Sequence, residues 1–469
     1  MTSTLATLLR PGCLSLRSRA FKFFGFLWLG FFGSLAATAS LVPVSTTEAL
    51  DESTLREQIL SRKEISHPDF PGRRLERLKV RFFSHRWKDG DWFGTTRILV
   101  PDRLDPRHAG WIFIAPTASS NPMPDLEMER DHHAWVALTF GIPVATVPQS
   151  GKHFGLSEIH KLSDHLSGRF LDTGDPSWLA LYPFAALHMR AATLVGKIVG
   201  IPTKRTIQMG SSITAHQLWK TAACDPRLAG MIITGDMGLY EKTRTGGARK
   251  SRMITPQRPV MARLDQAPAE VKAQLIRHVD KAVHARDVQA PLLWIVGSND
   301  FATSLPHISE FLDRFRMEKH LVFSPEYGHG CASWHHVRSV RMWIDHLLNG
   351  RPLTRLETPQ IVWNERTLRI RVRARSEAEL LGIRLYLCQA KDLHYFDSVW
   401  SVEGRWNGYR QARWESKFLE KRGDHWEAQI DLTPGRGPNL GLFLVANDRA
   451  GKSDGHTSLP MQWIHLDRR

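Results

Sequence analysis

The stretch from Ile207 to Trp219, IQMGSSITAHQLW, joins a short apolar run to a segment with helical spacing through Gly210-Ser211-Ser212. A serine on so sharp a strand-to-helix turn projects its hydroxyl from the top of a sheet, which is one way to present a nucleophile. Small residues between a strand and a helix are also ordinary turn chemistry. The turn alone therefore leaves both interpretations of Ser212 open.

Apolar strands and helices alternate on both sides of this turn. Such alternation predicts a mostly parallel sheet with helices on both faces, and right-handed crossovers make it doubly wound. Strand-like runs near 80–83 and 95–100 are compatible with the opening of this sheet, and 48–63 is predicted as a helix or linker. The later predicted strands are 110–115, 142–147, 205–209, 230–234, 292–296 and 320–323, and the predicted helices are 127–140, 178–199, 212–223, 304–316 and 334–348.

The first 39 residues differ from the rest of the chain. Four basic residues precede an apolar run over 23–35, and small residues follow at Ala37 and Ala39 with the spacing of a cleavage site. This pattern predicts a secretory signal peptide, and hence an exported protein that is periplasmic or secreted. An uncleaved leader would instead anchor the protein in the membrane. Residues 40–75 follow as a predicted N-terminal helix or linker.

The pattern changes again near residue 352. Residues 76–351 form the predicted α/β domain, which carries an insertion over about 236–290 without a strand pattern. Insertions of this size form lids or walls of a substrate site, or they are helical segments with a structural role alone. Residues 353–469 predict a small antiparallel β-sandwich rich in tryptophan. Its short alternating segments are 360–363, 368–373, 383–388, 425–432 and 440–447.

Charge, cysteine and histidine patterns narrow the possible partners. The formal net charge is +16, but the basic residues are spread through the chain without a nucleic-acid motif, so most are predicted to be solvated surface. The cysteines outside the leader allow at most one disulfide and have no zinc spacing. The histidine pairs lack the HExxH pattern, so no metal or other cofactor is predicted. These cysteines are Cys224, Cys331 and Cys388, and the histidines are His132 with His133, His153 with His160, and His335 with His336.

Candidate partners for Ser212 follow later strands. The apolar run 292–296 is followed by Asp300, and the next run, which ends near residue 323, is followed by His329. A serine nucleophile needs a histidine to take its proton and a carboxylate to orient that histidine, and α/β-hydrolases carry them in the order serine, acid, histidine. Because the carboxyl ends of parallel strands meet at one edge, we expect the three to converge. Taken singly, Asp300 is better explained as a cap of the following helix, and His329 as an ordinary loop histidine flanked by glycines.

Further residues are assigned around this set. Asp236, which follows the strand ending at residue 234, is the alternative acid. The tetrahedral intermediate needs backbone donors, predicted to be the amide of Ile213 and one from Thr117 or Ala118. If a local basic cluster lines the entrance, it would favour an anionic substrate, and otherwise it is ordinary surface charge. This cluster is Lys242, Arg244, Arg249, Lys250 and Arg252.

These features together resemble the PhoPQ-activated pathogenicity-related family of exported α/β-hydrolase-like proteins. The resemblance runs from about residue 80 to 460 and implies the hydrolase fold and the serine, acid and histidine set. The chain departs from the family pattern at Ile213-Thr214-Ala215, where a basic pair and a glycine are usual. The matching motifs are Ser84-His-Arg-Trp87 with Trp92, residues 141–148, the Trp178 helix, Gly210-x-Ser212 with Trp219, Thr221-Ala-Ala-x-Asp225-x-Arg227, the strand before Asp300, the loop 325–329, and the terminal β domain with Trp426.

Two functions follow from these patterns. The first is an exported serine hydrolase in which Ser212 attacks an ester or amide (peptide) carbonyl of a small-molecule or peptide substrate, His329 is base and then acid, and Asp300 orients His329. The second is a catalytically silent α/β-hydrolase scaffold that binds a protein or glycan partner through its aromatic-rich C-terminal β domain, since a fold alone does not establish a function. Membrane contact is expected only through an uncleaved leader.

Overall fold

The computed structural model places Val42–Arg469 in one compact unit. The predicted leader, Thr117, Ala118 and the basic cluster lie outside the residues that it describes. The described residues are 46–88, 90–116, 126–147, 159–236, 259–285, 287–300, 303, 305–329, 333–390, 413–433, 435–451 and 453–467.

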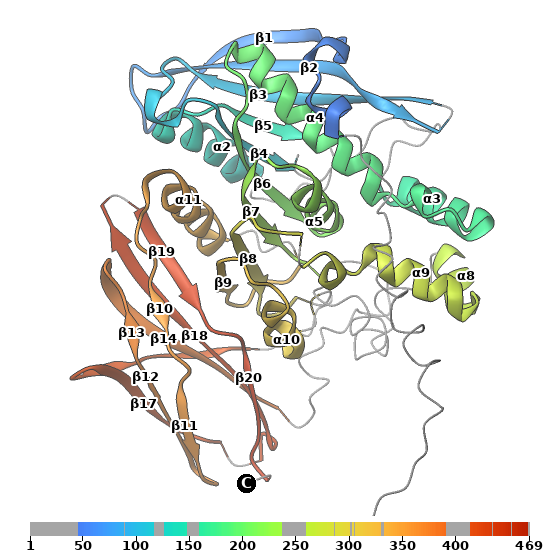
Figure 1. Ribbon diagram of the computed structural model, residues 1–469. Coiled ribbons are helices and arrows are strands. Elements are labelled where there is room, and N and C mark those ends of the chain that lie inside the picture. The colour runs from blue at the N-terminus through green and yellow to red at the C-terminus, as the bar shows by residue number, and fades with distance from the viewer. Residues whose placement is uncertain are drawn as a thin grey trace, which may run out of the picture. The chain divides into compact units, whose positions relative to one another are not determined.

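A nine-stranded mixed sheet forms the centre of this unit (Figure 1). In spatial order the strands are β1 (Gln58–Ser66), β2 (Arg74–Trp87), β3 (Gly90–Pro101), β5 (Val144–Val147), β4 (Trp111–Pro116), β6 (Arg205–Ser211), β7 (Leu228–Thr234), β8 (Leu292–Gly297) and β9 (Lys319–Ser324). The six strands β4 to β9 run parallel, as the alternating sequence pattern predicts, whereas β1, β2 and β3 are antiparallel and extend one side.

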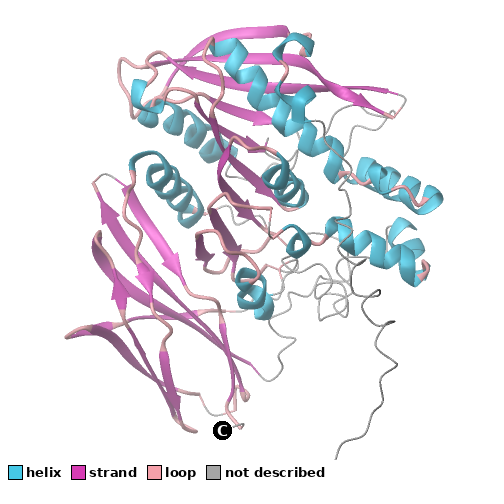
Figure 2. Cartoon of the chain, in the orientation of Figure 1, coloured by secondary structure: helices cyan, strands magenta, loops and turns pink. Residues whose placement is uncertain are grey.

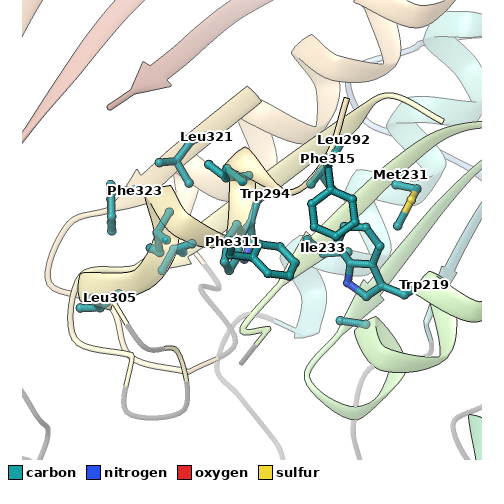
Figure 3. Packing of buried hydrophobic residues seen from close by; sticks show 14 of the residues in the cluster. Trp219, Met231, Ile233, Leu292, Trp294, Leu305, Phe311, Phe315, Leu321 and Phe323 are labelled. Carbon is teal, nitrogen blue, oxygen red and sulfur yellow. The ribbon is translucent and has the colours of Figure 1, made fainter. Parts of the chain in front are cut away.

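Helices cover both faces of the sheet because the central strands are apolar on both sides. Successive residues of β7 show this: Ile233 packs in a cluster with Trp219, while Ile232 packs in a different cluster with Trp343. Figure 3 shows the first cluster, in which Trp219 lies against the rings of Phe311 and Phe315. One face carries α4 (Leu181–Val199), α5 (Ile213–Cys224) and α10 (Ile308–Asp313), and the other carries α2 (Leu126–Phe140) and α11 (Trp334–Asn349).

The remaining helices are α1 near the start of the described residues, α3 between β5 and α4, and two in the insertion. Two of them and one 3-10 turn fall within the insertion predicted over 236–290. In the described part of the chain, no helix combines the length and the apolar character needed to cross a membrane. These elements are α1 (Thr46–Leu50), α3 (Ile159–Thr173), α8 (Pro259–Gln266) and α9 (Ala269–Val279), with the 3-10 turns η1 (Glu52–Thr54), η2 (Pro106–His108), η3 (Pro176–Trp178), η4 (Lys281–His284) and η5 (Leu305–His307).

Separate antiparallel sheets make up the C-terminal region, as the short alternating segments predict (Figure 2). The largest of them packs against the edge of the nine-stranded sheet, where the Phe323 N–H of β9 donates to the Ser458 hydroxyl at 3.0 Å. The sheets are β10–β13, β11–β12–β17–β16 and β15–β14–β18–β19, with β20 on β18. Their strands are β10 (Arg355–Leu356), β11 (Gln360–Trp363), β12 (Thr367–Val372), β13 (Ala374–Arg375), β14 (Glu379–Ala390), β15 (Glu415–Phe418), β16 (Glu420–Arg422), β17 (His425–Asp431), β18 (Asn439–Ala450), β19 (Ser453–Ser458) and β20 (Gln462–His465).

The N-terminal segment differs from its predicted helix or linker over 48–63. The helix ends at Leu50, and β1 occupies Gln58–Ser66. Its side chains are almost all exposed, so the strand has no apolar alternation for a sequence pattern to detect. Backbone pairing with β2, from Gln58 opposite Arg81 to Ser66 opposite Arg74, creates the strand instead.

Candidate functional site

Ser212 lies at the turn between β6 and α5 in a strained backbone conformation. Its φ is +52° and its ψ is −118°, a region that residues with a side chain rarely adopt. The turn is held in place because the Ser212 N–H donates to the Thr234 carbonyl oxygen on the adjacent strand at 2.9 Å. Strain of this kind at a strand-to-helix turn is the backbone geometry that exposes a serine hydroxyl at a sheet edge.

The neighbours of Ser212 explain how the turn is built. A Cβ atom at Gly210 would lie 2.7 Å from the Thr214 carbonyl oxygen and 2.9 Å from backbone atoms of Ala215, so helix and strand approach too closely for any side chain there. Thr214 stands where such a turn usually has its second glycine. Its hydroxyl accepts from the Ser211 N–H and donates to the Ser211 carbonyl oxygen, both at 2.7 Å. Thr214 therefore closes the turn with its side chain.

The structure brings Ser212, His329 and Asp300 together. The His329 Nε2 atom lies 2.7 Å from the Ser212 hydroxyl oxygen, and its Nδ1 atom lies 2.9 Å from Asp300 Oδ1. The His329 side chain keeps 17% of its surface exposed, whereas that of Asp300 is fully buried. The carboxylate is thus shielded from water behind a histidine that still reaches the surface.

Burial and neighbouring charge have opposite effects on the pKa of His329. Burial by itself would lower its pKa, but the charge and hydrogen bond of the Asp300 carboxylate, with a further contribution from the charge of Asp236, raise the pKa of His329 above its ordinary value. An Nδ1–H donated to Asp300 leaves Nε2 as the acceptor that faces Ser212. The imidazole is consequently oriented to take a proton from the serine hydroxyl.

Close backbone packing joins the Asp300 loop (residues 297–300) to the His329 loop (residues 325–329). A Cβ atom at Gly297 would lie 2.3 Å from the Tyr327 carbonyl oxygen, so glycine is required at that contact. The Asn299 N–H donates to the same oxygen at 2.9 Å, and the Glu326 N–H donates to the Ser298 hydroxyl at 2.7 Å. Asp300 and His329 therefore lie on two loops that are joined by close backbone packing and hydrogen bonds.

Asp236, the alternative acid, is fully buried and has other partners. Its carboxylate forms an ion pair with Lys281 and accepts from the Trp219 Nε1–H at 2.7 Å. Burial works to raise the pKa of Asp236, but the Lys281 charge holds it below its ordinary value, while burial lowers the pKa of Lys281 itself. Asp300, rather than Asp236, is thus the carboxylate that hydrogen-bonds His329.

Thr303 connects the two carboxylate residues and was missed at the sequence level. Its hydroxyl is shared between the Asp236 carbonyl oxygen at 2.6 Å and Asp300 Oδ2 at 2.9 Å. Thr303 is buried, and its hydrogen bond holds Asp300 Oδ2, the carboxylate oxygen that does not contact His329 Nδ1. Lys281 was also missed, because a lysine inside a helical insertion carries no local signal for a partner 45 residues away.

Other predicted site residues are only partly described. Ile213 begins α5, so its N–H is among the amides that lack an acceptor within the helix and is available next to Ser212. Among the described residues, no group of three or more His, Cys, Asp or Glu side chains is arranged to hold a metal ion. Cys224 and Cys388 are free thiols. The second oxyanion donor, Thr117 or Ala118, and the basic cluster of the insertion stay predictions.

Comparison with known proteins identifies the family. A profile described as PhoPQ-activated pathogenicity-related protein matches residues 71–394. The chain belongs to this family. The match spans Ser212, Asp300 and His329 and continues through β14, and the strands from β15 to β20 lie beyond its end. A search of curated protein sequences finds no match.

Several solved structures are similar to this PhoPQ-related protein at low sequence identity. Acetyl xylan esterase 1 from Thermoanaerobacterium sp. JW/SL YS485 is 17% identical, with a TM-score of 0.40 over 61% of this chain and 86% of the esterase. S-formylglutathione hydrolase from Agrobacterium tumefaciens is 13% identical, with a TM-score of 0.41 over 62% of this chain and 96% of that chain. The acylaminoacyl peptidase of Pyrococcus horikoshii is 10% identical, with a TM-score of 0.39 over 63% and 49% of the two chains.

Proposed function

We propose that this protein is an exported serine hydrolase that cleaves an ester or amide bond with Ser212 as nucleophile. One observation carries the proposal: an unbroken chain of hydrogen bonds runs from the Ser212 hydroxyl through His329 to the buried Asp300. The strained backbone of Ser212 supports it independently, because such strain is retained where the surrounding structure needs it. Export is proposed from the leader-like sequence of residues 1–39.

Acylation follows from the positions of these groups. His329 Nε2 takes the hydroxyl proton as the Ser212 oxygen forms a bond to the substrate carbonyl carbon. The carbonyl electron pair moves to oxygen, and the Ile213 N–H, with a second donor proposed from Thr117 or Ala118, binds that oxyanion. The Asp300 carboxylate stabilises the imidazolium without accepting its proton. His329 then gives the proton to the departing alcohol or amine.

Deacylation repeats the sequence with water. His329 removes a proton from water, the new hydroxyl attacks the acyl carbon, and the proton returns to the Ser212 oxygen as the carboxylic acid leaves. The substrate is proposed to be a small molecule or a peptide. Anionic character is proposed for it on the basis of the five basic residues between Lys242 and Arg252, which follow β7 in sequence as part of the insertion.

Active-site labelling tests the proposed nucleophile. We expect a fluorophosphonate probe to label the mature protein once per chain and the Ser212→Ala variant not at all, because the probe needs an activated serine oxygen. Ser211→Ala is the matched control and should be labelled like the wild type. A screen with activated esters and aminoacyl amides, run beside the Ser212→Ala variant, then separates esterase from peptidase activity. Labelling that persists in Ser212→Ala would exclude this serine, and an unlabelled wild type would favour the non-catalytic scaffold.

The pH dependence of kcat/KM provides a second test. His329 acts as a base only when neutral, so activity should rise as pH increases through its pKa. Because that pKa is raised, we expect the midpoint of the acidic limb above pH 6.5. Asp300→Asn removes the charge that raises it, so the midpoint of the residual activity should move to lower pH. A wild-type midpoint clearly below pH 6.5 would contradict this assignment of His329.

A further inference from the structure

A tryptophan from the C-terminal region contacts the Asp300 loop. The Trp414 Nε1–H donates to Asn299 Oδ1 at 2.9 Å, and both residues are buried, with 6% and 3% of their surface exposed. The indole packs edge-on against Phe443 of β18, with the ring centroids 5.0 Å apart. Phe443 in turn lies 4.7 Å from the ring of Phe323 on β9. Trp414 is thus held by a hydrogen bond to the Asp300 loop and by ring packing against β18.

Asn299 transmits this contact to the His329 loop. Its Nδ2 atom donates to the Glu326 carbonyl oxygen at 3.4 Å, and its backbone N–H donates to the Tyr327 carbonyl oxygen at 2.9 Å. Trp414 fixes which end of the Asn299 amide is the acceptor, and thereby directs its NH₂ group to Glu326. Asn299, the residue before Asp300, is therefore bonded directly to the segment just before His329.

The indole hydrogen bond is not a general requirement of tryptophan packing in this protein. Trp294 and Trp343 are completely buried in the core, and within the described residues their Nε1 atoms have no hydrogen-bond partner. By contrast, Trp414 donates to Asn299, which precedes Asp300 in the chain. Trp219 donates to Asp236, which Thr303 links to Asp300. Hydrophobic burial alone thus leaves the direction of the Trp414 N–H unexplained.

We infer that the C-terminal β region is a structural part of the site, with Trp414 as a positioning residue that acts through Asn299 on Asp300 and His329. This inference rests on the proposed serine hydrolase function. Loss of the indole N–H removes the donor that orients the Asn299 amide, which weakens the link between the two loops and misaligns His329 with Ser212. Small misplacements of a reacting group reduce rate far more than binding.

The test uses the full-length mature protein and the Trp414→Phe variant, which keeps an aromatic ring but removes the N–H. We expect kcat to fall roughly tenfold with KM within about twofold, in line with the rate cost of misplaced groups. The pKa of His329, followed by NMR titration of its ring, should move toward its ordinary value because Asp300 no longer holds it as closely. Tyr386→Phe is the matched control, since Tyr386 stacks on the same Phe443 ring and should change neither quantity.

A double-mutant cycle with Asn299→Ala identifies the path of the effect. If Trp414 acts through Asn299, the double variant should be no slower than Asn299→Ala alone. Additive losses would overturn the inference, as would wild-type kcat and His329 pKa in Trp414→Phe. A loss matched by Tyr386→Phe would also overturn it, because general weakening of the aromatic cluster would then be sufficient. The His329 titration needs no substrate, so failure of the hydrolase proposal would remain distinguishable from failure of this one.

Discussion

Replacement of Asp300 with Asn is expected to lower kcat by about 10⁴-fold while the protein stays folded. The carboxylate accepts the His329 Nδ1–H and so keeps Nε2 free to take the Ser212 proton. An amide at position 300 can turn its NH₂ group toward His329 and favour the tautomer with the proton on Nε2. That tautomer cannot act as a base toward the serine. The measurement is kcat on the best activated ester from the screen.

Asp236→Asn is the informative comparison, because Asp236 was the alternative acid. Its carboxylate contacts Lys281 and Trp219 rather than His329, so its replacement should leave kcat far less affected than Asp300→Asn does. Thermal melting shows whether each variant is folded at the assay temperature. A loss near 10⁴-fold in Asp236→Asn, together with a loss below tenfold in Asp300→Asn, would reverse the roles of the two carboxylates.

Replacement of Lys281 with Met is expected to lower the free energy of unfolding by roughly 3–5 kcal/mol. Lys281 and Asp236 are both almost completely buried, so removal of the cation leaves a carboxylate without its charge partner in a low-dielectric environment. The Trp219 N–H still donates to Asp236 but carries no full charge. Urea unfolding at pH 7, with the midpoint and slope compared between variants, measures the loss.

Two controls separate this charge effect from lost packing. The double variant Lys281→Met with Asp236→Asn removes both charges and should recover much of the stability, since the penalty comes from the unpaired charge. Arg314→Met breaks the exposed ion pair with Glu310, and its cost should stay below about 1 kcal/mol. If the double variant is less stable than both single variants, side-chain packing rather than charge dominates at Lys281.

Local sequence patterns were sufficient for the elements that carry Ser212, Asp300 and His329. The strands before these residues are short apolar runs, and in a parallel sheet their carboxyl ends share one edge whatever the side chains are. The polar strand β1 had no such signal, because it forms by backbone pairing with β2. Its existence depends on a partner strand rather than on its own residues.

The sequence by itself determined the strands and helices around Ser212, Asp300 and His329, the turn at Ser212 and the two candidate carboxylates, because these depend on apolar periodicity and small turn residues. Only the tertiary structure shows that His329 hydrogen-bonds Asp300 while Lys281 pairs with Asp236, since these contacts depend on how distant parts of the chain pack. It also revealed Trp414, whose partner lies 115 residues away. Hydrogen bonds and ion pairs need distances of about 3 Å, and chain order sets no such distance between remote residues.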